Sequence, residues 1–292
     1  MDKNEPIKSL EARKIVADIN RMNLDGADYE YILGLISRLI NGWPMQAITP
    51  HKDTRLYRGV VYKEKPAKKS FLGYPPKMLV RNFQRCNKPE SPMFYCSVDP
   101  YAILLEIGVT SGDKVYVSKW SMIKEFWINR IAPRSDMEIE NAVRDTVLTF
   151  FETKFAQPIH ETYSSQYKIT AAITEKLTSG GIVNGGNKSL GGLTYPSVAH
   201  PGRSENLAVR PEIVDQCLQL DYAEEWTITA VDEGGKISFN RTDFASDFTA
   251  DDIKWTGKAL HWTLGPGEEV TVMAEHDGWV ARDKNGNIVN PG

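Results

Sequence analysis

Short strand-like runs and helix-like runs alternate along the chain from Arg55 onwards, and this alternation limits the folds open to it. The runs LYRGVVY, MFYCSV and KVYVSKW are rich in β-branched and aromatic residues and are separated by loops with Pro, Gly and charges. Asp99 and Pro100 follow MFYCSV directly and are typical of a helix start, so PYAILLEI is predicted to be a short helix. Longer helices are predicted over 140–155 and 165–178. We therefore predict an α+β fold.

Both ends of the chain differ from this middle part. Apolar residues at helical spacing fill 28–41, where Asp28 can cap the start, and 9–22 is a second helical run. After about residue 231 short β-type runs return, with a Lys-Asn-Gly turn at 284–286. The sequence predicts a helical N-terminal segment (1–50), a central domain (51–232) and a small acidic β-rich C-terminal appendage (233–292).

Composition argues against several classes of protein. The three cysteines have no CxxC spacing and the five histidines are scattered, so neither a metal site nor a disulfide framework is expected. The N-terminal residues are polar, and no apolar run approaches the roughly 20 residues of a membrane span. We expect a cytoplasmic protein that needs no membrane. Six glycines in 180–192 follow a predicted helix instead of preceding one, which predicts a connection and not a phosphate-binding loop.

Charge is unevenly distributed along the chain. Residues 55–88 carry ten Lys and Arg against the single acid Glu64, whereas 221–292 carry fourteen acids against six bases. The formal net charge of -3 argues against nucleic-acid binding as the main function. The opposite charges of the two segments predict either an internal contact or head-to-tail self-association.

A few polar residues stand in apolar surroundings. Glu106 lies in AILLEIG, so its carboxylate is expected near a buried surface and would need a partner there; alternatively, it emerges on a solvated stripe of the helix. Arg85 and Asn87 precede the strand of Tyr95 and could hold a pyrophosphate, or form a solvated loop beside a core tyrosine. Ser197 follows a strand end, where a binding or a turn-forming serine can lie.

Taken in order, these pieces resemble the RES family of bacterial toxins and ADP-ribosyl-transfer enzymes over residues 55–222. The matching pieces are LYRGV with Arg58, RCN at 85–87, MFYCSVDPYAILLEIG with Tyr95 and Glu106, and GGLTYPSVAHPGRSENLAV with Ser197 and Asn206. Two features depart from the family pattern. Cys86 stands where an aromatic residue is usual, and the segment 120–180 is long.

The resemblance implies an ADP-ribosyltransferase-like split, mixed β core with helices around an NAD cleft, and NAD as a substrate. Glu106 would stabilise the oxocarbenium-like ribose, Arg85 would hold the pyrophosphate, and Tyr95 would line the nicotinamide-ribose pocket. These three are the expected catalytic residues. The residues expected to bind NAD are Arg58, Arg85, Asn87, Tyr95, Ser197 and Asn206.

Three functions remain open at this point. The resemblance favours cleavage of NAD at the nicotinamide–ribose bond, with water or phosphate as acceptor, in a possible toxin of a toxin–antitoxin or defence system. ADP-ribose transfer to a protein or nucleic acid would use the same pocket. From another class, the chain could be an inactive nucleotide- or partner-binding module. Many relatives are paired with a separately encoded antitoxin, which would then be a further partner.

Overall fold

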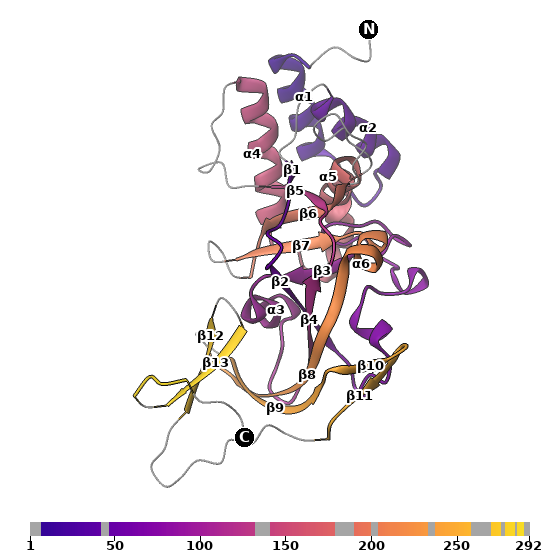
Figure 1. Ribbon diagram of the computed structural model, residues 1–292. Coiled ribbons are helices and arrows are strands. Elements are labelled where there is room, and N and C mark those ends of the chain that lie inside the picture. Colours follow the sequence, from indigo (N-terminus) through magenta and orange to yellow (C-terminus); the bar gives the residue numbers. More distant parts are fainter. Residues whose placement is uncertain are drawn as a thin grey trace. The chain divides into compact units, whose positions relative to one another are not determined.

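Two compact units make up the computed structural model, and each consists of several separate stretches of chain. The structure describes residues 7–41, 47–131, 141–178, 190–199, 204–232, 237–257, 270–275, 278–283 and 285–288. The predicted α+β class is confirmed, because these residues form helices together with parallel and antiparallel strands (Figure 1). The first unit comprises Met1–Lys52, Tyr74–Tyr95 and Lys124–Cys217, and the second comprises Asp53–Gly73, Cys96–Ile123 and Leu218–Gly292.

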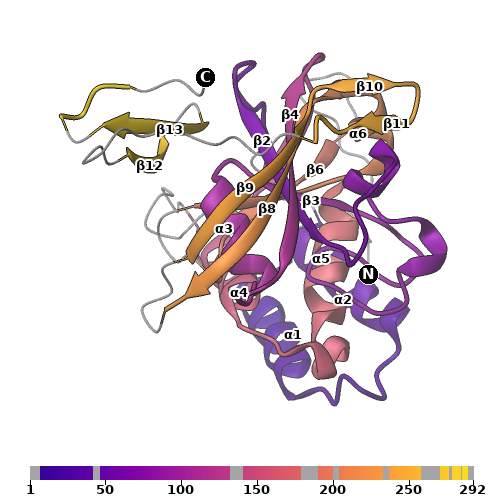
Figure 2. The same cartoon turned by 90° about the horizontal axis from the view of Figure 1, so that it is seen from below.

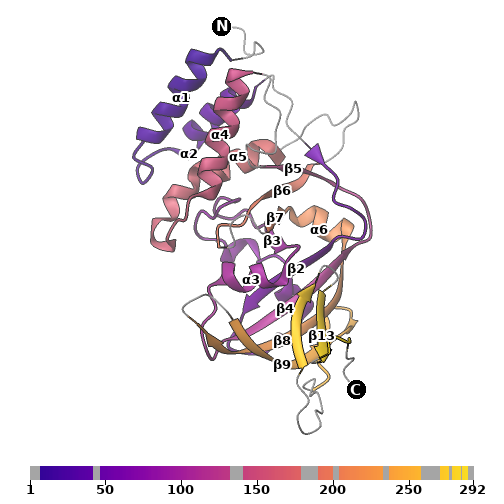
Figure 3. The same cartoon turned by 90° about the vertical axis from the view of Figure 1, so that its left-hand side faces the viewer.

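Helices dominate the first unit. Its elements are α1 (Ser9–Arg21), α2 (Tyr29–Ile40), the 3-10 helices η2 (Lys77–Leu79) and η4 (Glu161–Tyr167), α4 (Ala142–Ala156), α5 (Lys168–Thr178) and α6 (Pro211–Cys217). The carboxylate of Asp28 caps α2 as predicted, accepting hydrogen bonds from two backbone amides. Figure 3 shows α1, α2, α4 and α5 gathered in one group. The predicted helices are confirmed, although α5 begins three residues late because its predicted first turn is a 3-10 helix.

The strands of the first unit form a mixed sheet. They are β1 (Ala47–Ile48), β5 (Trp127–Arg130), β6 (Leu190–Pro196) and β7 (Glu205–Val209), adjacent in that order. Strands β5 and β6 are parallel, and the chain between them contains α4 and α5; the other pairs are antiparallel. Gly192 lets β6 lie against β7, since a Cβ there would collide with the backbone of Ala208.

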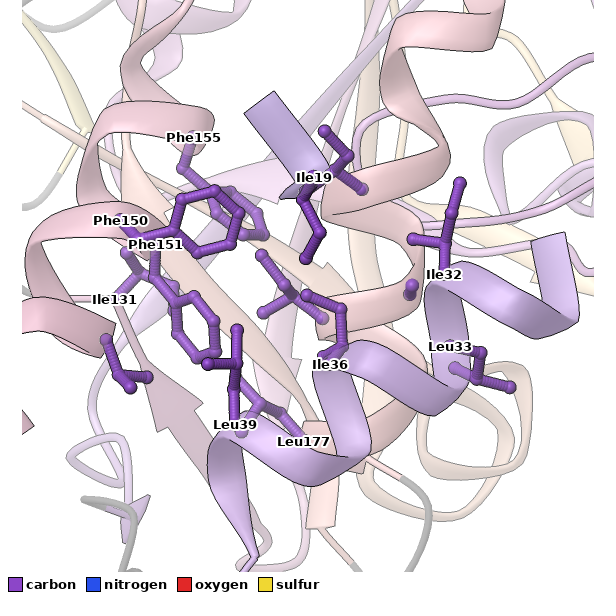
Figure 4. Packing of buried hydrophobic residues seen from close by; sticks show 14 of the residues in the cluster. Ile19, Ile32, Leu33, Ile36, Leu39, Ile131, Phe150, Phe151, Phe155 and Leu177 are labelled. Atoms are coloured by element: carbon purple, nitrogen blue, oxygen red, sulfur yellow. The ribbon is translucent and has the colours of Figure 1, made fainter. Parts of the chain in front are cut away.

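One apolar core joins these elements. The N-terminal helices contribute Ile19 and Ile36, α4 contributes Phe151 and Phe155, and α5 contributes Leu177 (Figure 4). Buried residues of 84–95 and of β6 belong to the same cluster: Cys86, Met93, Leu193 and Tyr195. The helices within 1–50 thus share a core with residues of the predicted central domain, so the compact units do not follow the predicted domain boundaries.

The second unit is built on an antiparallel sheet. Its main strands are β2 (Arg55–Val61), β4 (Lys114–Met122), β8 (Leu218–Val231) and β9 (Ile237–Ala245), adjacent in that order (Figure 2). The 3-10 helix η1 (Lys69–Leu72), β10 (Asp247–Thr249) and β11 (Asp252–Lys254) lie in the same unit, and β3 (Phe94–Ser97) is divided by the boundary between units. Its Ser97 lies opposite Tyr57 of β2.

Helix α3 (Pro100–Ile107) packs on this sheet, and a glycine sets how closely. A Cβ on Gly59 of β2 would lie 2.6 Å from both Ile103 Cγ2 and Ile107 Cδ1. Tyr57, two residues earlier on the same strand face, joins Ile103 and Leu104 in the core of this unit. The start of α3 is as predicted, with Pro100 in its first turn and the Asp99 carboxylate accepting the amide of Tyr101 at 2.9 Å.

The C-terminal region is rich in strands, as predicted. Strands β12 (Val270–Glu275) and β13 (Gly278–Asp283) pair as an antiparallel hairpin. The predicted turn after them is present at Asn285 and Gly286, where the φ of +83° favours glycine. Most of the glycine-rich segment, residues 179–189, lies outside the described residues. No described helix is long and apolar enough to cross a membrane.

Candidate functional site

The RCN sequence forms a tight turn in the first unit. Gln84 and Asn87 exchange two backbone hydrogen bonds, with N···O distances of 2.9 and 3.3 Å, so that Arg85 and Cys86 occupy the corner positions. Cys86 and the side chain of Asn87 are buried. A turn with buried polar groups needs hydrogen-bond partners from elsewhere in the fold.

Tyr95 of β3 supplies those partners. Its hydroxyl oxygen accepts the Cys86 amide at 2.9 Å and donates to Asn87 Oδ1 at 2.6 Å. Burial raises the pKa of Tyr95 well above its ordinary value. The hydroxyl therefore remains a protonated donor, and it fixes the backbone and the side chain of the turn together.

Arg85 ties the same turn to the C-terminal end of α4. Its Nη1 donates to the carbonyl oxygens of Phe155 at 2.6 Å and Gln157 at 3.3 Å, and Nη2 also donates to Gln157 at 3.3 Å. The guanidinium lies over the ring of Tyr167, 5.4 Å from its centroid. A cation at this end of a helix is favoured by the helix dipole and by the terminal carbonyls.

Ser197 and Asn206 lie near the ends of two paired strands. Ser197 directly follows β6, as predicted, and its amide donates to the Ser204 carbonyl at 3.0 Å. Asn206 of β7 lies opposite Tyr195 of β6, and both Ser197 and Asn206 are buried. Glu205 beside them accepts Nε of Arg130 at 2.9 Å, which ties β7 to β5.

Glu106 and Arg58 belong to the second unit. Glu106 occupies the last turn of α3 and is exposed, so the expectation of a carboxylate near a buried surface was wrong. The helix buries Ile103 and Leu104 on its other side, and Glu106 emerges on the solvated flank that the alternative interpretation described. Strand alternation places Arg58 on the face of β2 opposite α3. Burial raises the pKa of Cys96, and the positive charge of Arg58 offsets only part of that increase.

Sequence reasoning missed a pair of buried carboxylates in β8. Glu224 accepts Trp226 Nε1 at 2.7 Å and pairs with Arg241 at 3.2 Å, while burial raises its pKa. Glu225 and Asp243 of β9 both bind Lys65, at 2.9 and 2.6 Å. The signal for both was two adjacent acids inside a strand-like run.

Lys65 links the basic segment of the sequence to its acidic segment. Burial would raise the pKa of Asp243, but hydrogen bonds from Lys65 and other donors hold it below its ordinary value. Ser70 binds Asp251 through both its amide and its hydroxyl, at 3.0 and 2.9 Å. Part of the basic segment therefore contacts the acidic C-terminal part of the chain within the second unit. Whether the acidic part covers a cleft or supports self-association stays a prediction.

Comparison with known proteins assigns the family. Residues 57–230 match the RES domain, which covers more than half of the chain. The chain belongs to the RES-domain family. The RES domain is associated with NAD-utilising enzymes and toxins, and the match includes every residue predicted for the site. No curated protein gives a significant match to this chain.

The predicted site residues of this RES domain are distributed over both compact units. Arg85, Asn87 and Tyr95 are joined in one hydrogen-bonded turn of the first unit, and Ser197 and Asn206 lie at the β6–β7 pair of the same unit. The second unit carries Arg58 on β2 and Glu106 on α3. Among the described residues no group of three or more His, Cys, Asp and Glu could hold a metal ion.

Proposed function

We propose that this RES-domain protein consumes NAD by cleaving the bond between nicotinamide and ribose. The observation that carries the proposal is the RES match over 57–230, which includes the buried, hydrogen-bonded turn of Arg85, Asn87 and Tyr95. A structural turn alone needs no such residue set, because a solvated loop would satisfy the same backbone groups with water. The exposed Glu106 supports the proposal as well, because its carboxylate is accessible to a ligand.

The reaction needs one carboxylate and a set of binding groups. The C1′–N bond breaks and its electron pair goes to the pyridinium nitrogen, so neutral nicotinamide leaves and positive charge develops on the ribose. Water then forms a bond to C1′ and loses a proton, which gives ADP-ribose; phosphate as acceptor gives ADP-ribose 1″-phosphate. A carboxylate near the ribose stabilises the developing charge and can orient the acceptor.

Each predicted residue has a role in this proposal. Glu106 stabilises the ribose cation, and Arg58 contributes positive charge toward the pyrophosphate. Arg85 holds the turn through α4 and directs its remaining donors to a phosphate oxygen. Tyr95 keeps the Asn87 side chain in place, and the buried Ser197 and Asn206 provide polar groups for the nicotinamide amide or a nearby phosphate.

The test is NAD loss with product identification by chromatography. Wild-type protein should release nicotinamide, Glu106→Gln should reduce the rate by about a hundredfold or more, and Glu125→Gln should behave as wild type. Glu125 is a suitable control because it is exposed and lies in the first unit outside the site. Equal rates for the two variants would contradict the role of Glu106, and no nicotinamide release by wild type would contradict the proposal.

The acceptor and the cellular role belong to the same proposal. Intact-mass analysis after incubation with NAD separates the alternatives, since free ADP-ribose indicates hydrolysis and a covalent adduct on a protein indicates ADP-ribose transfer. A toxin restrained by a separately encoded antitoxin should arrest growth and deplete NAD when it is expressed alone. Glu106→Gln expressed at the same level should do neither.

A further inference from the structure

Helix α2 contacts the residues that flank the tight turn at 84–87 through the side chain of Tyr29. This tyrosine is the first residue of α2, next to the capping Asp28. Its ring packs on Phe83, which lies just before the turn, with ring centroids 5.2 Å apart. Its hydroxyl donates to Glu175 Oε2 of α5 at 2.9 Å. Burial and the carboxylate of Glu175 raise the pKa of Tyr29, so the hydroxyl stays a donor.

The residue that follows the turn is held by the same pair. Lys88 Nζ lies 3.0 Å from Glu175 Oε2 and 5.2 Å from the centroid of the Tyr29 ring. Tyr29 therefore contacts both flanks of the turn, with Phe83 on one side and Lys88 on the other. One carboxylate oxygen receives both the tyrosine hydroxyl and the lysine ammonium, which couples the two contacts.

Lys168 of α5 fixes the start of α2 in the same place. Its ammonium donates to the carbonyls of Leu24 and Ala27, at 2.7 and 2.8 Å, in the connection between α1 and α2. It also lies 5.8 Å from the ring centroid of Phe83. Tyr29 is thus not a mobile surface residue, because α5 holds it from two directions.

We propose that Tyr29 is a positioning residue for the RES-domain turn, so that the N-terminal helices form part of the NAD-binding framework although they precede the RES match. Inside the turn, Tyr95 and Arg85 fix Asn87 and the corner. Outside it, Tyr29 and Glu175 fix the residues from which the turn departs. The inference rests on the proposed NAD cleavage only for its kinetic consequence.

The experiment uses the full chain with Tyr29→Phe, which keeps the ring and removes the hydroxyl. Tyr31→Phe is the matched control, since Tyr31 lies in the same helix with its side chain 60% exposed. We expect Tyr29→Phe to raise KM for NAD on the order of tenfold, from losing a hydrogen bond to a charged group, while kcat changes less than twofold. Glu175→Gln should raise KM for NAD similarly. The KM of the double variant should not exceed that of the single variant with the higher KM.

A second measurement does not depend on catalysis. Hydrogen–deuterium exchange of peptides covering 84–95 should be faster in Tyr29→Phe than in Tyr31→Phe, while exchange in α4 stays unchanged. Unchanged KM and unchanged exchange would overturn the proposal, and so would faster exchange throughout the first unit, which would indicate a core-packing role. If wild type does not cleave NAD, the proposed function fails, and the exchange comparison alone decides whether Tyr29 positions the turn.

Discussion

The contact between Gly59 and α3 leads to a prediction that tests fold and function together. In Gly59→Ala, the new Cβ would lie 2.6 Å from Ile103 Cγ2 and Ile107 Cδ1. Carbon atoms are attracted best at about 3.5–4.0 Å, so α3 or its side chains must move by roughly 1 Å. Ile103 is buried, and its Cγ2 branches directly from Cβ, which leaves it little freedom to turn away.

Overpacking of this kind costs about 1–3 kcal/mol of unfolding free energy. Because α3 carries Glu106, a shift of roughly 1 Å should also reduce the rate of the proposed NAD cleavage by up to about a hundredfold. The assay is urea-induced unfolding followed by fluorescence, together with nicotinamide release under native conditions. Ile107→Val removes the Cδ1 atom, so adding it to Gly59→Ala should recover part of the lost stability.

Gly34→Ala is the matched control for this experiment. A Cβ at Gly34, within α2, would meet no atom within 4 Å, so the substitution should stabilise the protein by about 0.5–1 kcal/mol. If Gly59→Ala unfolds within about 0.5 kcal/mol of wild type, close packing of α3 on β2 would not be what holds this helix. If its stability falls while NAD cleavage is unchanged, the position of Glu106 would not limit the reaction.

Four further outcomes follow from the buried polar groups and thiols. Lys65→Met should cost about 2 kcal/mol by leaving Asp243 buried without its cation, and a smaller loss in urea unfolding than for an exposed lysine such as Lys63→Met would contradict this. The pKa of Asp243 is lower in the folded state than in the unfolded state. The stabilisation by Lys65 is therefore complete above the unfolded-state pKa and is lost as the pH falls through the folded-state pKa. The unfolding free energies of wild type and Lys65→Met should become equal in acid. Burial raises the pKa of Cys86 to about 12, and all three cysteines are buried, so a thiol reagent at pH 8 should label the native chain only after denaturation. Tyr95→Phe leaves buried polar groups of the turn unsatisfied and should lower stability by about 1–3 kcal/mol, measured against Tyr31→Phe.

Local signals were sufficient to predict most helices. Asp28 and the Asp99-Pro100 pair act through neighbouring backbone amides, so the sequence alone predicts where α2 and α3 begin. Strand β8 was harder, since Glu224 and Glu225 interrupt its apolar pattern. They are tolerated inside the sheet because Arg241 pairs with Glu224 and Lys65 pairs with Glu225. Arg241 comes from the neighbouring strand β9, whereas Lys65 comes from a distant part of the chain.

For the candidate site, the sequence indicates which residues to consider but not their contacts. The resemblance to the RES family named Arg85 and Tyr95, yet the guanidinium of Arg85 binds a carbonyl 70 residues away in α4. Two positions stayed open for Glu106, because its aliphatic neighbours suggested burial whereas a short helix can leave one flank in solvent. The structure shows the exposed position. The contribution of Tyr29 could not be inferred, because its partners in α5 lie 146 positions away.

The interleaved path of the chain constrains how this protein can be synthesised. The chain passes from one compact unit to the other after residues 52, 73, 95, 123 and 217, so neither unit is a continuous piece. During synthesis, the last stretch of the first unit is complete only when Cys217 has emerged from the ribosome. Strand β8 of the second unit emerges later still, and it pairs with both β4 and β9. We therefore expect both units to be completed only late in translation.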